Sequence, residues 1–283
     1  MTPADSFGEL TDRIAAWAQA QTDIRGLLIV GSRARTKRPA DPMSDLDLIM
    51  ITTNPSYYLK DTGWFERFGP ILLTFVERTA VGGLFERRVL FKGSLDVDFT
   101  IFPSDAFHKL QEVGLPPEMQ GILRRGINVL IDKDELLQNI AVSPEGTPSP
   151  PSAEQFGEHL DDFLYHAVWA AKKLRRGELW VAKVGCDMYM KILLLRMIEW
   201  HSRAIHGWDY DTWFGGRFLE RWAEPEVLAE LAKAFAHYDA DDIKSALLQT
   251  MLIHRRLSIE TGAKLGYHVS AEKYSEILKL VTD

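Results

Sequence analysis

The sequence has 283 residues, enough for one large domain or two of ordinary size. Hydrophobic residues make up 46% and charged residues 26%, as in globular proteins, and no apolar stretch approaches the roughly 20 residues of a membrane span. The formal net charge of −7 argues against a protein that wraps a long nucleic acid, because such proteins need basic surfaces. A single cysteine, Cys186, excludes an internal disulfide, and the N-terminus resembles no secretion signal, so we expect a cytoplasmic location.

The first half of the chain combines apolar strand patterns with amphipathic stretches. Helical spacing predicts a helix over residues 6–21. The expected strands are residues 27–30, 46–51, 71–77, 87–91 and 94–102, with a short edge strand at 126–133. We also expect a turn at 81–83 and helices at 56–68 and 104–112. This half is therefore predicted to be a mixed β-sheet with flanking helices.

The second half is predicted to be helical throughout. Residues 143–152 are rich in Pro, Ser and Gly and have no apolar periodicity, which indicates a linker. Beyond it, apolar residues at three and four spacing predict helices over 153–175, 178–205, 214–236, 240–265 and 271–281. We therefore predict an α+β protein in which a sheet domain, 1–142, precedes an all-α helical bundle, 153–283.

Two aspartates stand at the start of the second predicted strand, where Asp45 and Asp47 flank Leu46. Alternate residues of a strand share a face, so the two carboxylates lie side by side and repel unless a cation lies between them. Mg²⁺ binds such oxygen ligands together with waters and phosphates. A later strand carries Asp96 and Asp98 in the same alternation. If the two strands are neighbours, their carboxylates converge in the layout of a two-metal phosphoryl-transfer site.

A glycine–serine pair, Gly31–Ser32, follows the first predicted strand. Glycine allows a close approach of the backbone to a ligand, and amide groups with the Ser32 hydroxyl can hold phosphate oxygens. The loop continues with several basic residues, although the P-loop pattern is absent. Taken singly, such a pair is usually a turn, and an Asp-x-Asp pair is often a solvated strand end. Their order along the chain favours a common site.

Gly31-Ser32, Asp45-x-Asp47 and Asp98 resemble, in this order, the nucleotidyltransferase superfamily related to DNA polymerase β. The longer stretches VGSRARTKRPADPMSDLDLIMI, LDVDFTIFP, FLYHAVWAAKKLRRGELWVAKVGCDMYMKILLLRMIEWH and ETGAKLGYHVSAEKY are similar to the aminoglycoside 6-adenylyltransferases, the streptomycin-modifying group. The similarity keeps its order over nearly the whole chain. It implies Mg²⁺-dependent transfer of AMP from ATP to a hydroxyl of an aminoglycoside, with release of pyrophosphate.

The resemblance also implies roles for individual residues. Asp45, Asp47 and Asp98 would bind a pair of Mg²⁺ ions, and Asp98 would help to activate the acceptor hydroxyl; Asp96 stays open as the alternative third ligand. The residues expected to contact the nucleotide are Gly31, Ser32, Arg33 and Lys183. Because an aminoglycoside carries several positive charges, its pocket should be acidic and partly aromatic. The main candidates are Asp187, Trp169 and Glu199, and further candidates are Asp161, Asp162 and Trp180.

Other functions stay open at this stage. The same fold could adenylylate a lincosamide, another hydroxylated metabolite or a protein side chain. It could also extend an RNA 3′ end, which the acidic balance disfavours, or bind a nucleotide without catalysis, which the presence of all three carboxylates disfavours. The sequence does not distinguish ATP from GTP or identify the acceptor hydroxyl.

Overall fold

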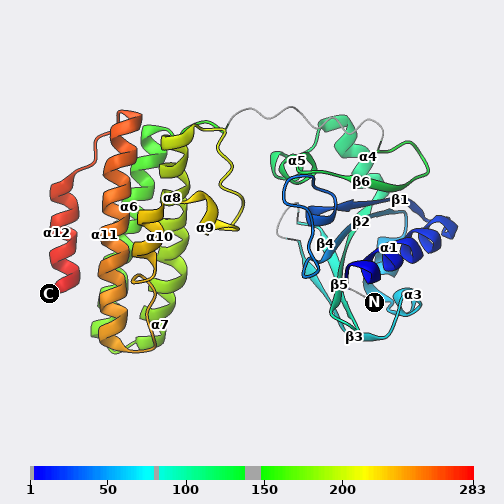
Figure 1. Ribbon diagram of the computed structural model, residues 1–283, viewed down its shortest axis with the longest axis horizontal. Helices are drawn as coiled ribbons and strands as arrows, with labels where there is room; N and C mark the ends of the chain where they lie inside the picture. Colours follow the sequence, from blue (N-terminus) through cyan, green and yellow to red (C-terminus); the bar gives the residue numbers. More distant parts are fainter. Residues whose placement is uncertain (1–2, 80–82, 138–147) are drawn as a thin grey trace. The chain divides into compact units, whose positions relative to one another are not determined.

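The computed structural model describes residues 3–79, 83–137 and 148–283 (Figure 1). The chain forms two compact units, Met1–Pro144 and Glu145–Asp283. Residues 143–147 of the expected linker and residues 81–82 of the expected turn lie outside the described residues. None of the helices in the described parts of the chain combines the length and apolar character of a membrane span.

The first unit is built on a six-stranded mixed sheet with the order β3-β4-β5-β2-β1-β6. Its strands are β1 (Ile24–Val30), β2 (Leu46–Thr52), β3 (Ile71–Arg78), β4 (Phe85–Phe91), β5 (Leu95–Pro103) and β6 (Asn128–Asp132). Strands β2 and β5 pair in parallel, and the other neighbouring strands described in this sheet are antiparallel. All six predicted strands are confirmed, with β6 at an edge as expected, and so is the α+β class.

Five α-helices and one 3₁₀ turn accompany the sheet in the described residues: α1 (Pro3–Ala20), η1 (Gly31–Arg33), α2 (Pro55–Lys60), α3 (Gly63–Glu66), α4 (Ser104–Val113) and α5 (Pro117–Arg124). The single helix predicted over 56–68 is wrong, because Asp61 is extended and its side chain accepts from the Gly63 amide at 2.9 Å, which starts a new turn. Helix α5 was not predicted, since the Pro116–Pro117 pair suggests a turn, although Pro is well tolerated at a helix start.

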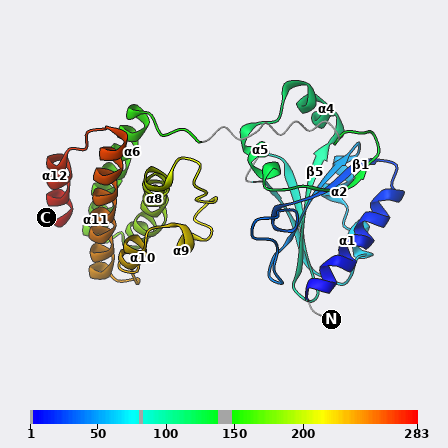
Figure 2. The ribbon, with the colours of Figure 1, turned by 45° about the horizontal axis from the view of Figure 1, so that its top comes forward.

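The two faces of the sheet pack against different helices (Figure 2). On one face, Leu48 and Phe99 join the core formed with α1, α2 and α3. On the other face, Ile51 and Phe102 pack with side chains of α4 and α5. Alternation places Asp47 and Asp98 on this second face, nearer the start of β2 and β5 than the residues packed under α4 and α5.

The second unit is an all-α bundle, as predicted. Its elements are α6 (Ala153–Arg175), α7 (Leu179–Val184), the π-helical turn η2 (Gly185–Tyr189), α8 (Met190–His206), α9 (Leu219–Trp222), α10 (Pro225–Leu231), α11 (Ala240–Leu265) and α12 (Ala271–Thr282). Ser152 caps α6: its hydroxyl accepts from the Gln155 amide while the Gln155 side chain accepts from the Ser152 amide. Two buried clusters form the interior of this unit.

Two of the predicted helices differ from the structure. The helix expected over 178–205 is interrupted by η2, a π-helical turn that local sequence patterns do not reveal. The helix expected over 214–236 is wrong, because only α9 and α10 form there. Gly215, Gly216 and Phe218 have left-handed backbones, with φ angles of 61°, 76° and 59°, which a right-handed helix cannot include.

Candidate functional site

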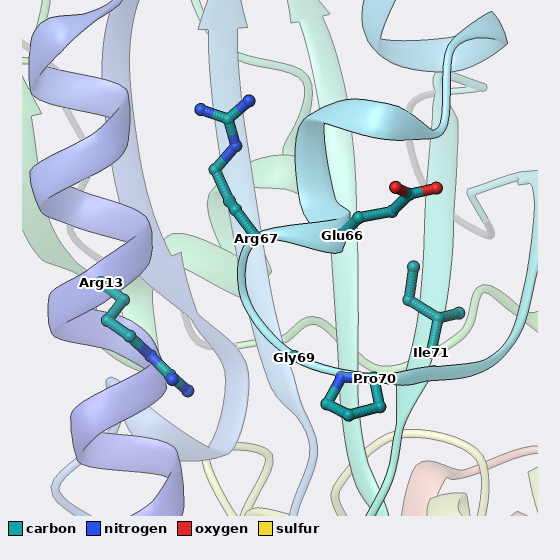
Figure 3. Close-up of a pocket in the computed structure, with 6 residues that line it drawn as sticks. All are labelled: Arg13, Glu66, Arg67, Gly69, Pro70 and Ile71. Atoms are coloured by element: carbon teal, nitrogen blue, oxygen red, sulfur yellow. The ribbon is translucent and has the colours of Figure 1, made fainter.

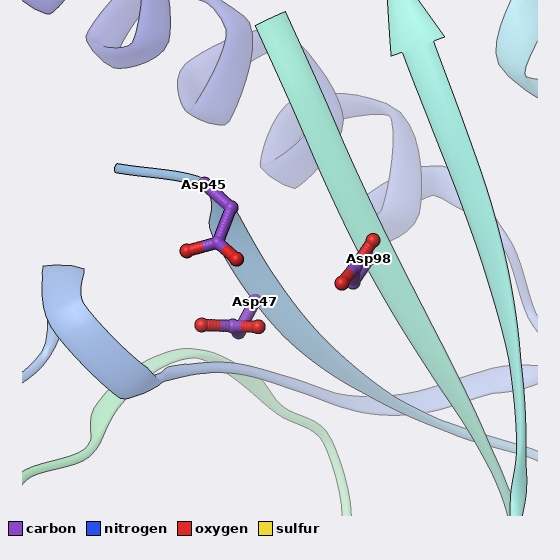
Figure 4. Close-up of side chains that lie close together, drawn as sticks. All are labelled: Asp45, Asp47 and Asp98. Carbon is purple, nitrogen blue, oxygen red and sulfur yellow. The ribbon is translucent and has the colours of Figure 1, made fainter. Parts of the chain in front are cut away.

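Three carboxylates converge where β2 and β5 lie side by side (Figure 4). Asp47 and Asp98 are direct partners in the parallel pairing, and Asp45 immediately precedes β2. Each offers a carboxylate oxygen within 4.8 Å of the others. Asp96, the alternative third ligand, is exposed and does not belong to this group. The register of two strands thus gathers side chains about fifty residues apart in sequence.

Asp98 is the buried member of the group, with 8% of its surface exposed. Burial raises the pKa of this carboxyl to about 6, because a charge is poorly solvated there. The nearby Arg88 guanidinium, 3.4 Å from Asp98 Oδ2, opposes the rise in pKa, while the negative charges of Glu86 and Asp45 add to it. The site therefore concentrates negative charge, and Arg88 opposes it at Asp98.

Arg88 is a site residue that the sequence reasoning missed. It lies on β4 directly opposite Asp98 and also pairs with Glu77 at 2.6 Å and Glu86 at 2.9 Å. The sequence did contain a signal, because Arg88 lies in the predicted strand 87–91, which directly precedes the predicted strand that carries Asp98. Its partners could be assigned only with the register of three strands.

Gly31 and Ser32 lie in η1, which leads away from β1. Gly31 has a φ of 69°, and a Cβ placed there would lie 2.1 Å from Asp47 Oδ2, so glycine is the residue that the close approach permits. Ser32 is buried, and its Oγ has no hydrogen-bond partner among the described residues. A buried hydroxyl with unused donor capacity beside three carboxylates suits a phosphate oxygen brought in with a cation.

Arg33 binds the protein backbone in this structure. Its Nε donates to the Asp45 carbonyl at 2.8 Å and its Nη2 to the Ser44 carbonyl at 2.7 Å. The guanidinium lies 3.7 Å from the centre of the Phe7 ring, and burial lowers its pKa. These contacts tie η1 to the segment that carries Asp45, whereas the expected contact with phosphates stays a prediction.

The other predicted residues belong to the second unit and do not form one group. Asp187 is ion-paired with Lys183 and lies 3.6 Å from Lys191, whose pKa is lowered by burial. Trp169 lies over Gly185, where an added Cβ would be 2.6 Å from its ring. Glu199 pairs with Arg196 at 3.7 Å, and burial raises its pKa. Lys183 and Asp187 therefore satisfy each other's charge.

A separate cavity of about 560 Å³ opens between α1 and the turn after α3 (Figure 3). Its lining consists of Arg13, Glu66, Arg67, Gly69, Pro70 and Ile71. None of the predicted site residues contributes to it, and its charged groups are two arginines and one glutamate. We therefore locate the candidate site at the three aspartates, where the chemistry is concentrated.

The residues of this site fit a divalent metal ion. Three carboxylates provide the hard oxygen ligands that Mg²⁺ prefers, and the Ser32 hydroxyl, which has no partner among the described residues, can donate to a phosphate oxygen that is a further ligand. A cation placed between the three aspartates would offset their mutual repulsion and the cost of burying the Asp98 charge.

A mixed sheet that presents a carboxylate triad beside a glycine–serine turn is the architecture of a nucleotidyltransferase. A family model described as streptomycin adenylyltransferase matches residues 6–283. The chain therefore belongs to the streptomycin adenylyltransferase family, as the motifs predicted, and it is an enzyme of the nucleotidyltransferase class.

Known relatives are similar over nearly their whole length. The aminoglycoside 6-adenylyltransferase of Bacillus subtilis (strain 168) is 23% identical over 272 residues, which is 92% of this chain and 91% of the relative. That of Campylobacter jejuni is 22% identical over 266 residues, 92% and 89% of the two chains. A crystal structure of an aminoglycoside 6-adenyltransferase from Bacillus subtilis aligns with a TM-score of 0.46 and 18% identity, over 97% of this chain and 96% of that one.

Proposed function

We propose that this protein transfers AMP from ATP to a hydroxyl of an aminoglycoside of the streptomycin type, with Mg²⁺ as cofactor and pyrophosphate as the other product. Membership of the family and the names of the relatives support this reaction and acceptor. The observation that carries the proposal is the meeting of Asp45, Asp47 and Asp98 within 4.8 Å beside the Gly31–Ser32 turn.

The nucleotide end of the site would be formed by η1 and the start of β2. The Ser32 hydroxyl would donate to a phosphate oxygen, because it is buried and has no partner among the described residues. Asp45, Asp47 and Asp98 would hold the Mg²⁺ pair, which would supply Lewis-acid stabilisation of the phosphate oxygens. Arg33 would keep Asp45 in place through its two carbonyl contacts.

In the proposed step, the acceptor oxygen attacks the α-phosphorus of ATP. A new O–P bond forms, the bond between the α-phosphorus and the bridging oxygen breaks, and pyrophosphate leaves with that oxygen. The hydroxyl proton passes to Asp98 or through it to water. No covalent protein intermediate is needed, which agrees with the burial of Cys186, whose thiol pKa is raised to about 11.

The test is incubation of the full chain with Mg-ATP and streptomycin, followed by mass measurement of the antibiotic and a separate assay for pyrophosphate. We expect a gain of one AMP group, loss of the reaction with a chelator, and its recovery when Mg²⁺ is restored. GTP in place of ATP identifies the preferred nucleotide.

Parallel incubations with a lincosamide and with a short RNA cover the alternative acceptors. AMP on the lincosamide or at the RNA 3′ end, with none on streptomycin, would overturn the proposed acceptor while keeping the nucleotidyltransferase class. Pyrophosphate release that persists without Mg²⁺ or any other divalent ion would overturn the proposed cofactor.

A further inference from the structure

The acidic candidates in the second unit differ in whether a cation already neutralises them. Asp161 is ion-paired with Lys273, Asp187 with Lys183, and Glu199 lies 3.7 Å from Arg196. Asp162 is the exception, because no lysine or arginine pairs with it in the described parts of the chain. Of these acids, it keeps its negative charge available for a ligand.

The contacts of Asp162 come instead from an imidazole and a phenol. His166 Nδ1 lies 2.7 Å from Asp162 Oδ1, one helical turn further along α6. The Tyr189 hydroxyl donates to Asp162, at 3.1 Å from Oδ2 and 3.2 Å from Oδ1. Neither partner carries a permanent positive charge. The carboxylate side chain is 37% exposed, so its orientation is fixed while solvent still reaches it.

The His166 ring, which contacts this carboxylate, lies among three other aromatic rings. The His166 ring centre lies 4.4 Å from that of Tyr189, 5.2 Å from that of Tyr165 and 6.3 Å from that of Trp169. Tyr165 is 68% exposed and Tyr189 is 39% exposed, although large aromatic side chains are usually covered. Exposed aromatic faces beside an anion form the arrangement that binds organic cations, since the ring faces and the carboxylate both attract positive charge.

The π-helical turn η2 explains how Tyr189 reaches Asp162. Tyr189 is the last residue of this turn, which inserts extra backbone between α7 and α8. Tyr189 is thereby directed toward α6, where it meets Asp162, twenty-seven positions earlier in sequence. Asp187 lies in the same turn and is held by Lys183. Two residues of this turn thus differ in role: Asp187 is paired with a lysine, and Tyr189 donates to Asp162.

We propose that Asp162, together with the rings of Tyr165, His166 and Tyr189, is a subsite for a protonated amino or guanidino group of the acceptor. This inference rests on the proposed function, because that function supplies a polycationic acceptor. The carboxylate accepts hydrogen bonds from the cation, and the rings cover its faces. Asp187 is a main candidate in the sequence analysis, but it is not part of this subsite, because it is ion-paired with Lys183 and lies 3.6 Å from Lys191.

Calorimetric titration of streptomycin into the full chain, without ATP or metal, tests the subsite. Asp162→Asn should weaken binding about 10-fold or more, as expected for a lost charge-assisted hydrogen bond. Asp161→Asn is the matched control: it removes the same charge one residue earlier, from an acid paired with Lys273, and should change affinity less than about 3-fold. Tyr189→Leu should also weaken binding, whereas thermal unfolding of all variants should stay close to wild type.

The kinetic readout should agree with the titration. In Asp162→Asn the KM for streptomycin rises about 10-fold or more, while the KM for ATP is unchanged. Equal affinity of wild type and Asp162→Asn overturns the subsite, as does an equal loss in Asp161→Asn, which would indicate general charge attraction. If the wild-type protein neither binds nor modifies streptomycin, the proposed acceptor is wrong. That outcome is read from the wild type alone, whereas the subsite is tested by comparing variants with the wild type.

Discussion

Asp47 and Asp98 are direct partners in the parallel pairing of β2 with β5. Parallel pairing sets successive residues of β2 beside successive residues of β5, so both aspartates lie on the same face at the same level. The antiparallel pairing of β1 with β2 brings η1 to this end of β2 and sets Gly31 against Asp47. The site is thus a consequence of strand register.

Replacing either of these aspartates should remove catalysis without unfolding the protein. In Asp47→Asn and Asp98→Asn we expect transfer to fall at least about 100-fold, because each change removes a metal ligand. Thermal stability should be unchanged or higher, since each change relieves repulsion within the triad. Asp12 is exposed on α1, so Asp12→Asn serves as the control and should keep full activity. Near-normal turnover in either triad variant would disprove the metal assignment.

A methyl group at Gly31 should disable the site. A Cβ there would lie 2.1 Å from Asp47 Oδ2, so Gly31→Ala must displace that carboxylate. We expect Mn²⁺ affinity, measured by electron paramagnetic resonance without nucleotide, and transfer rate to fall together by about 10-fold or more.

Gly93→Ala is the matched control for this change. Gly93 also has a positive φ, 90°, yet among the described residues, its two chain neighbours aside, no atom lies within 4 Å of the added Cβ. Both variants should lose about 1 kcal/mol of unfolding free energy through backbone strain. Equal activity of the two variants would show that the contact with Asp47 is irrelevant to function.

Arg33 should support the metal site through its contact with the Asp45 backbone. Arg33→Lys keeps the charge but loses the fork that binds the Ser44 and Asp45 carbonyls together. We therefore expect weaker Mn²⁺ binding in the absence of nucleotide and a kcat reduced about 10-fold. The opposite pattern, in which the KM for ATP rises and metal binding without nucleotide is unchanged, would identify Arg33 as a phosphate ligand.

The stability of the helical unit should depend on pH through two histidines. His254 is fully buried, stacks on Phe163 at 3.5 Å between ring centres, and its Nε2 lies 3.4 Å from His159 Nε2. Burial lowers the pKa of His159 to about 4 and lowers that of His254 as well. The unfolded chain, with a histidine pKa near 6.5, therefore binds these protons more readily than the folded chain.

The sign of the effect follows from this difference. The stabilisation is complete above about pH 6.5 and declines as the pH falls toward about 4, by about 1.4 kcal/mol per pH unit for each histidine. Urea unfolding between pH 7.5 and 4 measures it. His159→Gln should reduce the slope between pH 6 and 4.5, and a slope identical to that of wild type would contradict the role of His159.

Local patterns determined the elements that depend on contacts between near neighbours in sequence. Short apolar runs predicted all six strands, and helical spacing predicted α6, α11 and α12. The order of Gly31-Ser32, Asp45-x-Asp47 and Asp98 indicated the nucleotidyltransferase superfamily, and the longer similar stretches indicated the family that the family model confirms. These features are encoded by residue type and spacing, because side-chain direction in a strand or helix repeats with a fixed period.

Only the tertiary structure decided which side chains find partners far along the chain. Asp161 and Asp162 are adjacent in sequence, yet they point about 100° apart on α6. One therefore meets Lys273, 112 positions away, and the other meets Tyr189 in the π-helical turn. Arg88 and Arg33 likewise took partners that no local pattern specified. Charge pairing depends on distance in space, and that distance is set only after strands and helices have packed.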